Sequence, residues 1–412
     1  MNYSDIPLHE SLQKALAREG YTQPTPIQEQ AIPIVLSGSD LIGVAQTGTG
    51  KTAAFSLPIL HRLQSTYHAP ISKKPRALIL APTRELAAQI FASLQTYGRH
   101  TKLRFTAIYG GVGQNPQVNA MQKGIDVLVA TPGRLLDLIN QRHIFLDEVE
   151  VLVLDEADRM LDMGFAKDMK KIVDMIPKKR QTLLFSATMS QTVDRFAKPI
   201  LHNPQRVEVA PQATTADKVD QRILFVDTDK KNELLLHLLQ EEHLDKVLVF
   251  VKTKHRANKL AALLSKSKIK AKAIHGDKSQ NQRIQALKSF STGGCRVLVG
   301  TDVAARGLDI DDISHVINYD LPLDTENYVH RIGRTARAGA EGVAYSFATP
   351  EDKALLNQIQ QVIGQEIANM HHEYHSEKAR NAPPKKISRG GGGKKRSGNR
   401  NRSRPRYSRR QR

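Results

Sequence analysis

The chain has 412 residues, of which 40% are hydrophobic, and it carries a formal net charge of +20 at pH 7. This length and hydrophobic content are enough for ordinary globular cores, so we expect two domains and a tail. The single cysteine, Cys295, excludes an internal disulfide framework and a cysteine-rich zinc site, which fits a reducing cytosol. No apolar run approaches the roughly 20 residues that span a bilayer, and the N-terminus lacks the segments of an export signal. We therefore expect a cytoplasmic protein without membrane contacts.

Short β-branched runs alternate with helical segments in the first half of the chain, at residues 41–44, 77–80, 126–130, 149–154 and 182–185. The second half repeats this alternation at residues 222–226, 246–251, 271–274, 295–299, 315–318 and 343–347. The pattern predicts parallel sheets buried on both faces and hence two α/β domains. Between them, residues 209–218 contain Pro211 and small polar residues with little hydrophobic periodicity, so we place the hinge there.

The sequence AQTGTGKT at residues 45–52 follows the first apolar run and has the form of a phosphate-binding loop. Its glycines let backbone N–H groups close around phosphates, Lys51 reaches the β and γ phosphates, and the Thr52 hydroxyl can bind Mg²⁺. The loop begins with Ala45 instead of the glycine of the general pattern. We expect ATP to bind at this loop, through Ala45, Gln46, Thr47, Gly48, Thr49, Gly50, Lys51 and Thr52.

A pair of carboxylates, Asp155 and Glu156, closes the apolar run at residues 149–154. The carboxyl edge of a parallel sheet is where open α/β folds bind ligands, and the phosphate loop should meet the pair there. In hydrolytic NTPases an aspartate supports Mg²⁺ while a neighbouring group orients the attacking water. We assign these two roles to Asp155 and Glu156 respectively.

Three arginines recur at a spacing of three in HRIGRTAR, residues 330–337, in the second predicted domain. Such a run can be a solvated surface face or a phosphate-binding patch. A γ-phosphate bound by the first domain needs cationic charge as it leaves. An arginine supplied by the opposite domain accelerates hydrolysis by ~10³ to 10⁵ and makes it conditional on domain closure.

Positive charge is concentrated at the C-terminal end. Residues 371–412 hold 15 Lys and Arg against 2 Glu, a net charge of +13, while the first 370 residues hold 46 against 39, or +7. From about residue 376 onward the chain has too few apolar residues to offset the entropy of ordering, so we expect disorder. Its arginines and glycines favour an RNA tether, and the alternative is a solubilising extension.

Taken together, these motifs resemble those of the DEAD-box ATP-dependent RNA helicases over roughly residues 1–365, and most of all those of the bacterial RhlE type. The matching runs of the first domain are GYTQPTPIQ at 20–28, AQTGTGKT at 45–52, PTRELA at 82–87, the glycine pair 110–111, TPGR at 131–134, DEAD at 155–158 and SAT at 186–188. Those of the second are VFVKT at 249–253, TDVAARGLD at 301–309 and HRIGRTAR at 330–337.

The resemblance implies an α/β fold with two tandem RecA-like parallel-sheet domains and a disordered basic C-terminal tail. The ATP-binding domain, with its Q motif at 20–28, would span residues 1–208. A linker at 209–218 would lead to the helicase C-terminal domain at 219–370, and the basic tail would fill 371–412.

The resemblance also implies roles for individual residues. Gln28 would read adenine with aromatic support from Tyr3 or Tyr21, and Asp309 would contact the ribose. Arg334 and Arg337 match arginine fingers that would act with Lys51, Asp155 and Glu156, and the matched groups that couple nucleotide state to unwinding are Ser186, Thr188 and the pair Asp158 and His330. The matched RNA contacts are Arg84, Gly111, Thr131, Arg134, Thr253, Arg283 and Thr301. Two positions depart from the usual pattern: Tyr3 replaces a phenylalanine, and Ala336 replaces a glycine.

The function implied is RNA-stimulated ATP hydrolysis with Mg²⁺, coupled to domain closure, local duplex unwinding and RNP remodelling. We expect a monomer that binds duplex and single-stranded RNA with little sequence preference and acts with ribosomal precursors or RNA-decay proteins. One alternative is an ATP-gated RNA clamp or scaffold without significant unwinding. Another is a DNA helicase.

Overall fold

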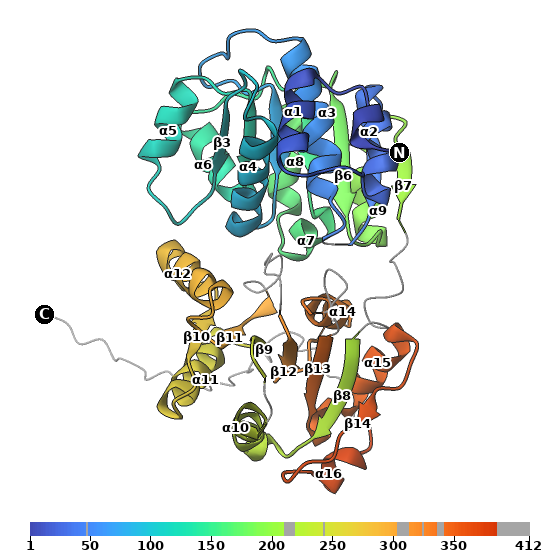
Figure 1. Cartoon of the computed structure of the whole chain (residues 1–412), viewed down its shortest axis with the longest axis vertical. Helices are drawn as coiled ribbons and strands as arrows, with labels where there is room; N and C mark the ends of the chain where they lie inside the picture. The colour runs from blue at the N-terminus through green and yellow to red at the C-terminus, as the bar shows by residue number, and fades with distance from the viewer. Residues whose placement is uncertain are drawn as a thin grey trace, which may run out of the picture.

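The computed structural model describes residues 1–46, 48–209, 219–241, 244–302, 313–323, 325–335 and 342–384. These residues form two α/β domains that follow one another along the long axis of the molecule (Figure 1). Within the described ranges, each domain is built on one seven-stranded sheet whose paired strands all run parallel. The prediction of two parallel-sheet domains is confirmed.

Domain 1 carries its strands in the order β3-β4-β2-β5-β6-β1-β7. The strands are β1 Leu41–Val44, β2 Ala77–Leu80, β3 Phe105–Ile108, β4 Val127–Ala130, β5 Val151–Leu154, β6 Gln181–Ser186 and β7 Gln205–Glu208. The helices are α1 Glu10–Arg18, α2 Pro26–Leu36, α3 Lys51–Ser65, α4 Arg84–Tyr97, α5 Asn115–Gln122, α6 Pro132–Asn140, α7 Ala157–Asp162, α8 Ala166–Asp174 and α9 Gln191–Ala197.

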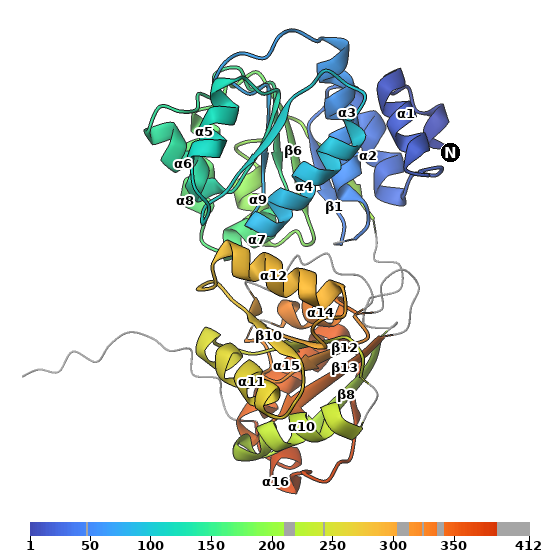
Figure 2. The same cartoon turned by 60° about the vertical axis from the view of Figure 1, so that its left-hand side comes forward.

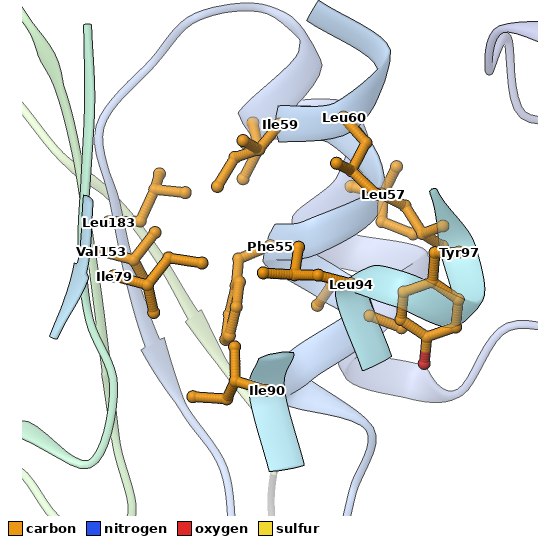
Figure 3. Packing of buried hydrophobic residues seen from close by; sticks show 14 of the residues in the cluster. Phe55, Leu57, Ile59, Leu60, Ile79, Ile90, Leu94, Tyr97, Val153 and Leu183 are labelled. Atoms are coloured by element: carbon orange, nitrogen blue, oxygen red, sulfur yellow. The ribbon is translucent and has the colours of Figure 1, made fainter. Parts of the chain in front are cut away.

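The alternation of side chains along each strand explains why helices cover both faces of this sheet. Along β5, Val151 and Val153 join the hydrophobic cluster that contains Phe55 of α3, whereas Leu152 and Leu154 join the cluster on the opposite face. Figure 3 shows the first cluster, where the side chains of α3 and α4 meet those of the strands. A strand that is apolar on both faces thus ends at Leu154, directly before Asp155.

Phe55 is central to this cluster: it is fully buried, and its ring lies 5.4 Å from that of Phe185 between centroids. We predict that Phe55→Ala lowers the free energy of unfolding of domain 1 by about 3–5 kcal/mol, because the lost contacts leave a cavity. Urea denaturation of the intact chain measures this. Phe145→Ala is the matched control, since Phe145 is an exposed residue of the same domain. Equal shifts for the two variants would contradict the prediction.

Domain 2 repeats the arrangement with strand order β10-β11-β9-β12-β13-β8-β14. The strands are β8 Val219–Phe225, β9 Val247–Phe250, β10 Ala271–Ile274, β11 Val297–Gly300, β12 His315–Asn318, β13 Gly342–Ala348 and β14 Ala368–Asn369. The helices are α10 Lys231–Glu241, α11 Lys254–Lys266, α12 Gln280–Ser291, α14 Glu326–Ile332, α15 Lys353–Ile363 and α16 Glu377–Arg380. In both views α12 lies on the side of domain 2 that faces domain 1 (Figure 2).

Three strands go beyond the predicted runs: β3, β7 and β14. All three lie at the edges of their sheets. An edge strand is covered less completely than a central one, so its sequence need not be a continuous apolar run. In β7, for example, Val207 is the one buried residue. The hinge at 209–218 lies, apart from Val209, outside the described residues.

The prediction places the start of the tail too early. Residues 371–384 belong to the described structure, and α16 packs on domain 2 at the end far from domain 1 (Figure 1). Ser376 donates its backbone N–H to the Phe225 carbonyl and its hydroxyl to Asp227, and Ala379 is fully buried in the core. The buried Ala379 and the two hydrogen bonds of Ser376 hold this segment on domain 2, and the sequence alone did not reveal them. The whole net charge of +13 therefore belongs to residues 385–412, which contain 13 Lys and Arg and no acidic residue.

Candidate nucleotide and RNA sites

The phosphate loop lies between β1 and α3, at the carboxyl edge of the domain 1 sheet. Gly48 and Gly50 have φ values of +86° and +91°, a backbone conformation that glycine adopts without strain. Lys51 is buried at the first position of α3, where its Nζ donates a hydrogen bond of 2.7 Å to the Ala45 carbonyl. The Lys51 side chain therefore lies within the loop, and the positive N-terminal end of the α3 dipole points toward the loop as well. Thr47 lies outside the described residues.

Gln28 is joined to this loop. Its side chain is buried; Nε2 donates to the Gly50 carbonyl at 3.0 Å, and Oε1 accepts the backbone N–H of Thr25 at 2.8 Å. The Tyr3 hydroxyl also donates to Oε1. Thr25 donates its hydroxyl to the Thr49 carbonyl at 2.8 Å. The segment predicted to read adenine and the loop predicted to hold phosphate are thus parts of one hydrogen-bonded unit.

Tyr3 and Tyr21, the two alternatives for aromatic support, occupy different environments. Tyr3 is buried, and burial raises the pKa of its hydroxyl to about 12, so it stays a hydrogen-bond donor to Gln28. Tyr21 is 43% exposed, and its ring packs edge-on against those of Tyr3 and Tyr97, each at 6.2 Å between centroids. Tyr21 therefore has the free face that a stacked base needs, while Tyr3 fixes the glutamine.

The two carboxylates follow β5 directly, and their pKa values are shifted in opposite directions. Complete burial raises the pKa of Asp155 to about 7, although the Lys51 charge opposes the shift. Burial alone would also raise the pKa of Glu156, but Arg159, Lys51 and Arg334 outweigh it and hold that pKa below the ordinary glutamate value. Glu156 has a left-handed backbone, with φ 51° and ψ 53°, and it caps helix α7. The turn thus points two adjacent acidic side chains into different surroundings.

Asp158 contacts the SAT segment that follows β6. Its Oδ2 accepts the backbone N–H groups of Ala187 and Thr188, at 3.2 and 3.0 Å, and the Thr188 hydroxyl at 3.2 Å. The hydroxyl of Ser186 donates to the Thr188 carbonyl at 2.7 Å. The structure therefore joins the predicted coupling groups Asp158, Ser186 and Thr188 within domain 1. The pairing of Asp158 with His330 stays a prediction.

Arg334 brings domain 2 to the same site. It is buried directly after α14, its Nε donates to the His330 carbonyl at 3.1 Å, and its charge contributes to lowering the pKa of Glu156. The last of these effects operates between the domains, so the predicted hydrolytic glutamate and one predicted arginine finger face a common region. Arg337 and Asp309 lie outside the described residues.

Two predicted RNA-contact arginines of domain 1 lie against the same segment. The Arg84 guanidinium lies against Gly111, whose φ of +79° is a backbone conformation that glycine adopts without strain. Arg134 donates to the Val112 carbonyl at 3.5 Å. Thr131 precedes α6, and its hydroxyl makes no capping bond to that helix. Arg84 and Arg134 thus both contact the segment at 111–112.

Domain 2 provides Thr253 and Thr301 at the ends of neighbouring strands. They follow β9 and β11, which are paired with Phe250 opposite Gly300. The RNA contact of Arg283 stays a prediction. Its side chain is 10% exposed, and its guanidinium forms a 2.9 Å ion pair with Glu85 of domain 1. In this arrangement Arg283 closes the contact between the domains and does not present its charge to solvent.

Comparison with known proteins identifies the family. A model of the DEAD/DEAH box helicase family matches residues 25–196, and one of the helicase conserved C-terminal domain matches residues 230–339. DEAD-box ATP-dependent RNA helicase CshA of Bacillus subtilis is 44% identical over 370 residues, which cover 90% of this chain and 74% of the relative. The corresponding protein RhpA of Helicobacter pylori is 43% identical over 366 residues, or 89% and 73% of the two chains. The chain belongs to the DEAD-box family of ATP-dependent RNA helicases.

Two solved structures are similar to this DEAD-box helicase over most of its chain. Dbp5 of S. cerevisiae bound to RNA and ADP BeF3 is 34% identical, with a TM-score of 0.80 over 90% of this chain and 95% of that chain. A variant of Dbp5 bound to Gle1 and IP6 has the same identity and coverage but a TM-score of 0.71. By TM-score, the present structure is more similar to the first of these two structures than to the second.

Sequence reasoning missed two arginines of this helicase that the structure singles out. Arg331, the first arginine of HRIGRTAR, is buried, and its guanidinium binds both carboxylate oxygens of Asp302 at 2.5 and 2.8 Å. It also donates to Asn318 and to the Asp320 carbonyl, and so joins Asp302 to the end of β12. Arg159 is the second. The signal that could have drawn attention to them is position: Arg331 lies inside a functional motif, and Arg159 directly follows one.

Proposed function

We propose that this helicase hydrolyses ATP when RNA and ATP together hold the two domains closed, and that closure distorts a short RNA duplex. The observation that carries this proposal is the division of the hydrolytic groups: Glu156 comes from domain 1, and Arg334 comes from domain 2 and influences the Glu156 carboxylate. A site divided in this way is complete only in the closed arrangement, so hydrolysis reports closure.

Within this proposal, ATP lies along the carboxyl edge of the domain 1 sheet. Gln28 donates to and accepts from the adenine edge while Tyr21 stacks on the ring. Binding of the β and γ phosphates moves the Lys51 ammonium from the Ala45 carbonyl to phosphate oxygens. Glu156 orients water, and Arg334 together with Arg337 stabilises the charge on the departing phosphate. Asp309 would complete the site at the ribose.

The residues around Asp155 fit a magnesium ion. Hard oxygen ligands suit Mg²⁺, and here the Thr52 hydroxyl and the Asp155 carboxylate both follow strands that end at the same sheet edge. A carboxylate that is buried with a raised pKa is stabilised in its ionised form by a nearby cation. We propose that Thr52 and Asp155 hold Mg²⁺, which would neutralise phosphate charge when bound.

RNA is proposed to cross the face made by Arg84, Gly111, Thr131 and Arg134 of domain 1 and by Thr253 and Thr301 of domain 2. These hydroxyls, guanidinium groups and backbone amides suit the sugar–phosphate backbone, which predicts little sequence preference and recognition of 2′-hydroxyls. The test is the ATPase rate of the intact chain with single-stranded RNA, with single-stranded DNA of the same sequence, and without nucleic acid. Stimulation by RNA alone is expected. Equal rates in all three conditions would overturn the proposal, and equal stimulation by DNA would favour a DNA helicase.

The basic segment at 385–412 is proposed to tether RNA. We predict that its removal weakens RNA binding at low salt and reduces its salt dependence, while the RNA-free ATPase rate is unchanged. If about 6 side chains contact phosphates, the logarithmic salt slope on single strands should flatten by about 4. Fluorescence anisotropy over a salt series measures both quantities. Truncation after residue 384 spares α16, whose loss would disturb domain 2. An unchanged slope would support a solubilising extension instead.

We further propose that the protein is of the RhlE type, is monomeric and cytoplasmic, and remodels ribosomal precursors or acts with RNA-decay proteins. The motif resemblance and the short basic segment support this assignment. None of the described helices is long and apolar enough to cross a membrane. Crosslinking to RNA in cells, followed by sequencing of the bound RNA, would identify the target.

A further inference from the structure

Arg159 lies beside the proposed hydrolytic residue, in the first turn of α7. Its guanidinium donates from Nη1 to Oε2 of Glu156 at 2.7 Å, and the two side chains are only 5% and 9% exposed. A buried bond between opposite charges is short and strong, and it restricts the carboxylate to one orientation. Arg159 thus fixes one of the two oxygens of Glu156.

The backbone conformation of Glu156 sets the direction of the side chain that Arg159 restrains. Its left-handed conformation allows the side chain to leave the strand end at an angle that an extended residue would not give. A group that orients water must be held within a fraction of an ångström of its working position. With Oε2 bound to Arg159, the task of orienting water falls to Oε1.

We propose that Arg159 is a positioning residue that orients Glu156 for hydrolysis. The proposal rests on the role given above to Glu156 and on the buried ion pair that joins the two side chains.

The first test compares Arg159→Met and Arg159→Lys with wild type in RNA-stimulated ATP hydrolysis. Because misplacing a catalytic group by about 1 Å can cost ~10²-fold, we expect Arg159→Met to lower kcat by roughly 10- to 100-fold, with the KM for ATP nearly unchanged. Lysine, which keeps the charge without the fork, should restore part of the rate. Arg76→Met is the matched control, since Arg76 has an equally buried side chain and a 2.6 Å ion pair with Glu150 in the same domain. A loss in kcat no larger than that of Arg76→Met would overturn the proposal.

A double-mutant cycle separates positioning from general stability. In a Glu156→Gln background, measured in single turnovers with excess enzyme, Arg159→Met should cost less than about twofold, because its target is already disabled. The same fractional loss in both backgrounds would overturn the proposal. If Glu156→Gln alone hydrolyses ATP like wild type, the proposed function fails. If Glu156→Gln is inactive while Arg159→Met is normal, this inference alone fails.

Discussion

Arg334→Ala is expected to lower the kcat of RNA-stimulated ATP hydrolysis by ~10³- to 10⁵-fold, the range for an arginine that stabilises a phosphoryl transition state. Arg334 is buried after α14 of domain 2, yet its charge contributes to lowering the pKa of Glu156 in domain 1. Removing the guanidinium leaves the ATP-binding residues of domain 1 in place. The affinity for ATP in the absence of RNA should therefore stay within a few-fold of wild type.

Steady-state ATPase assays with saturating single-stranded RNA measure this effect, and titration with a fluorescent ATP analogue measures binding. Arg222→Ala is the matched control, since Arg222 is an exposed arginine of the same domain that pairs with Asp220. A kcat for Arg334→Ala within threefold of wild type would mean that hydrolysis does not need domain 2, and the divided site would have to be abandoned.

The second large effect is expected for Glu156→Gln. This change keeps the size and part of the hydrogen bonding of the side chain but removes the carboxylate that orients water, so kcat should fall by about 10²- to 10⁴-fold. ATP and RNA binding should persist, because Gln28, Lys51 and the RNA face are untouched. The variant should therefore accumulate in the closed complex with RNA.

A strand-displacement assay on a short RNA duplex gives the second readout for this variant. Wild type should displace the strand in repeated turnovers, while Glu156→Gln should at most complete one. A clamp without unwinding activity would displace no strand in either form. Glu148→Gln serves as control, since Glu148 is an exposed glutamate that precedes the same strand.

Much of the ATP site could be predicted because its residues follow strand ends. A parallel sheet brings all its carboxyl ends to one edge, so AQTGTGKT after β1 and Asp155-Glu156 after β5 had to meet once the strands were recognised. The central strands were recognisable because burial on both faces requires apolar runs. At the edges this requirement weakens, and β3 and β7 were missed for that reason.

The partners of charged side chains could not be predicted in the same way. The sequence around Arg283 is typical of a solvated helix face. Its pairing with Glu85, about 200 residues earlier in the chain, depends on how the two domains come together. Arg159 could have faced solvent on a short helix; its bond to Glu156 depends on the left-handed turn at Glu156. The packing of α16 likewise depends on contacts with β8 and on the burial of Ala379 in the domain 2 core, which no local pattern encodes.

The hydrogen bond from Gln28 to the Gly50 carbonyl has a consequence for nucleotide choice. In the proposed function Gln28 reads the adenine edge, and its side chain cannot turn toward a different base without releasing the Gly50 carbonyl of the phosphate loop. A nucleotide with the wrong base would therefore disturb the loop that holds its own phosphates, although the triphosphate itself is identical. Discrimination against GTP should then appear mainly as slower turnover at saturation and less as weaker binding, because the mismatch misaligns the reacting group.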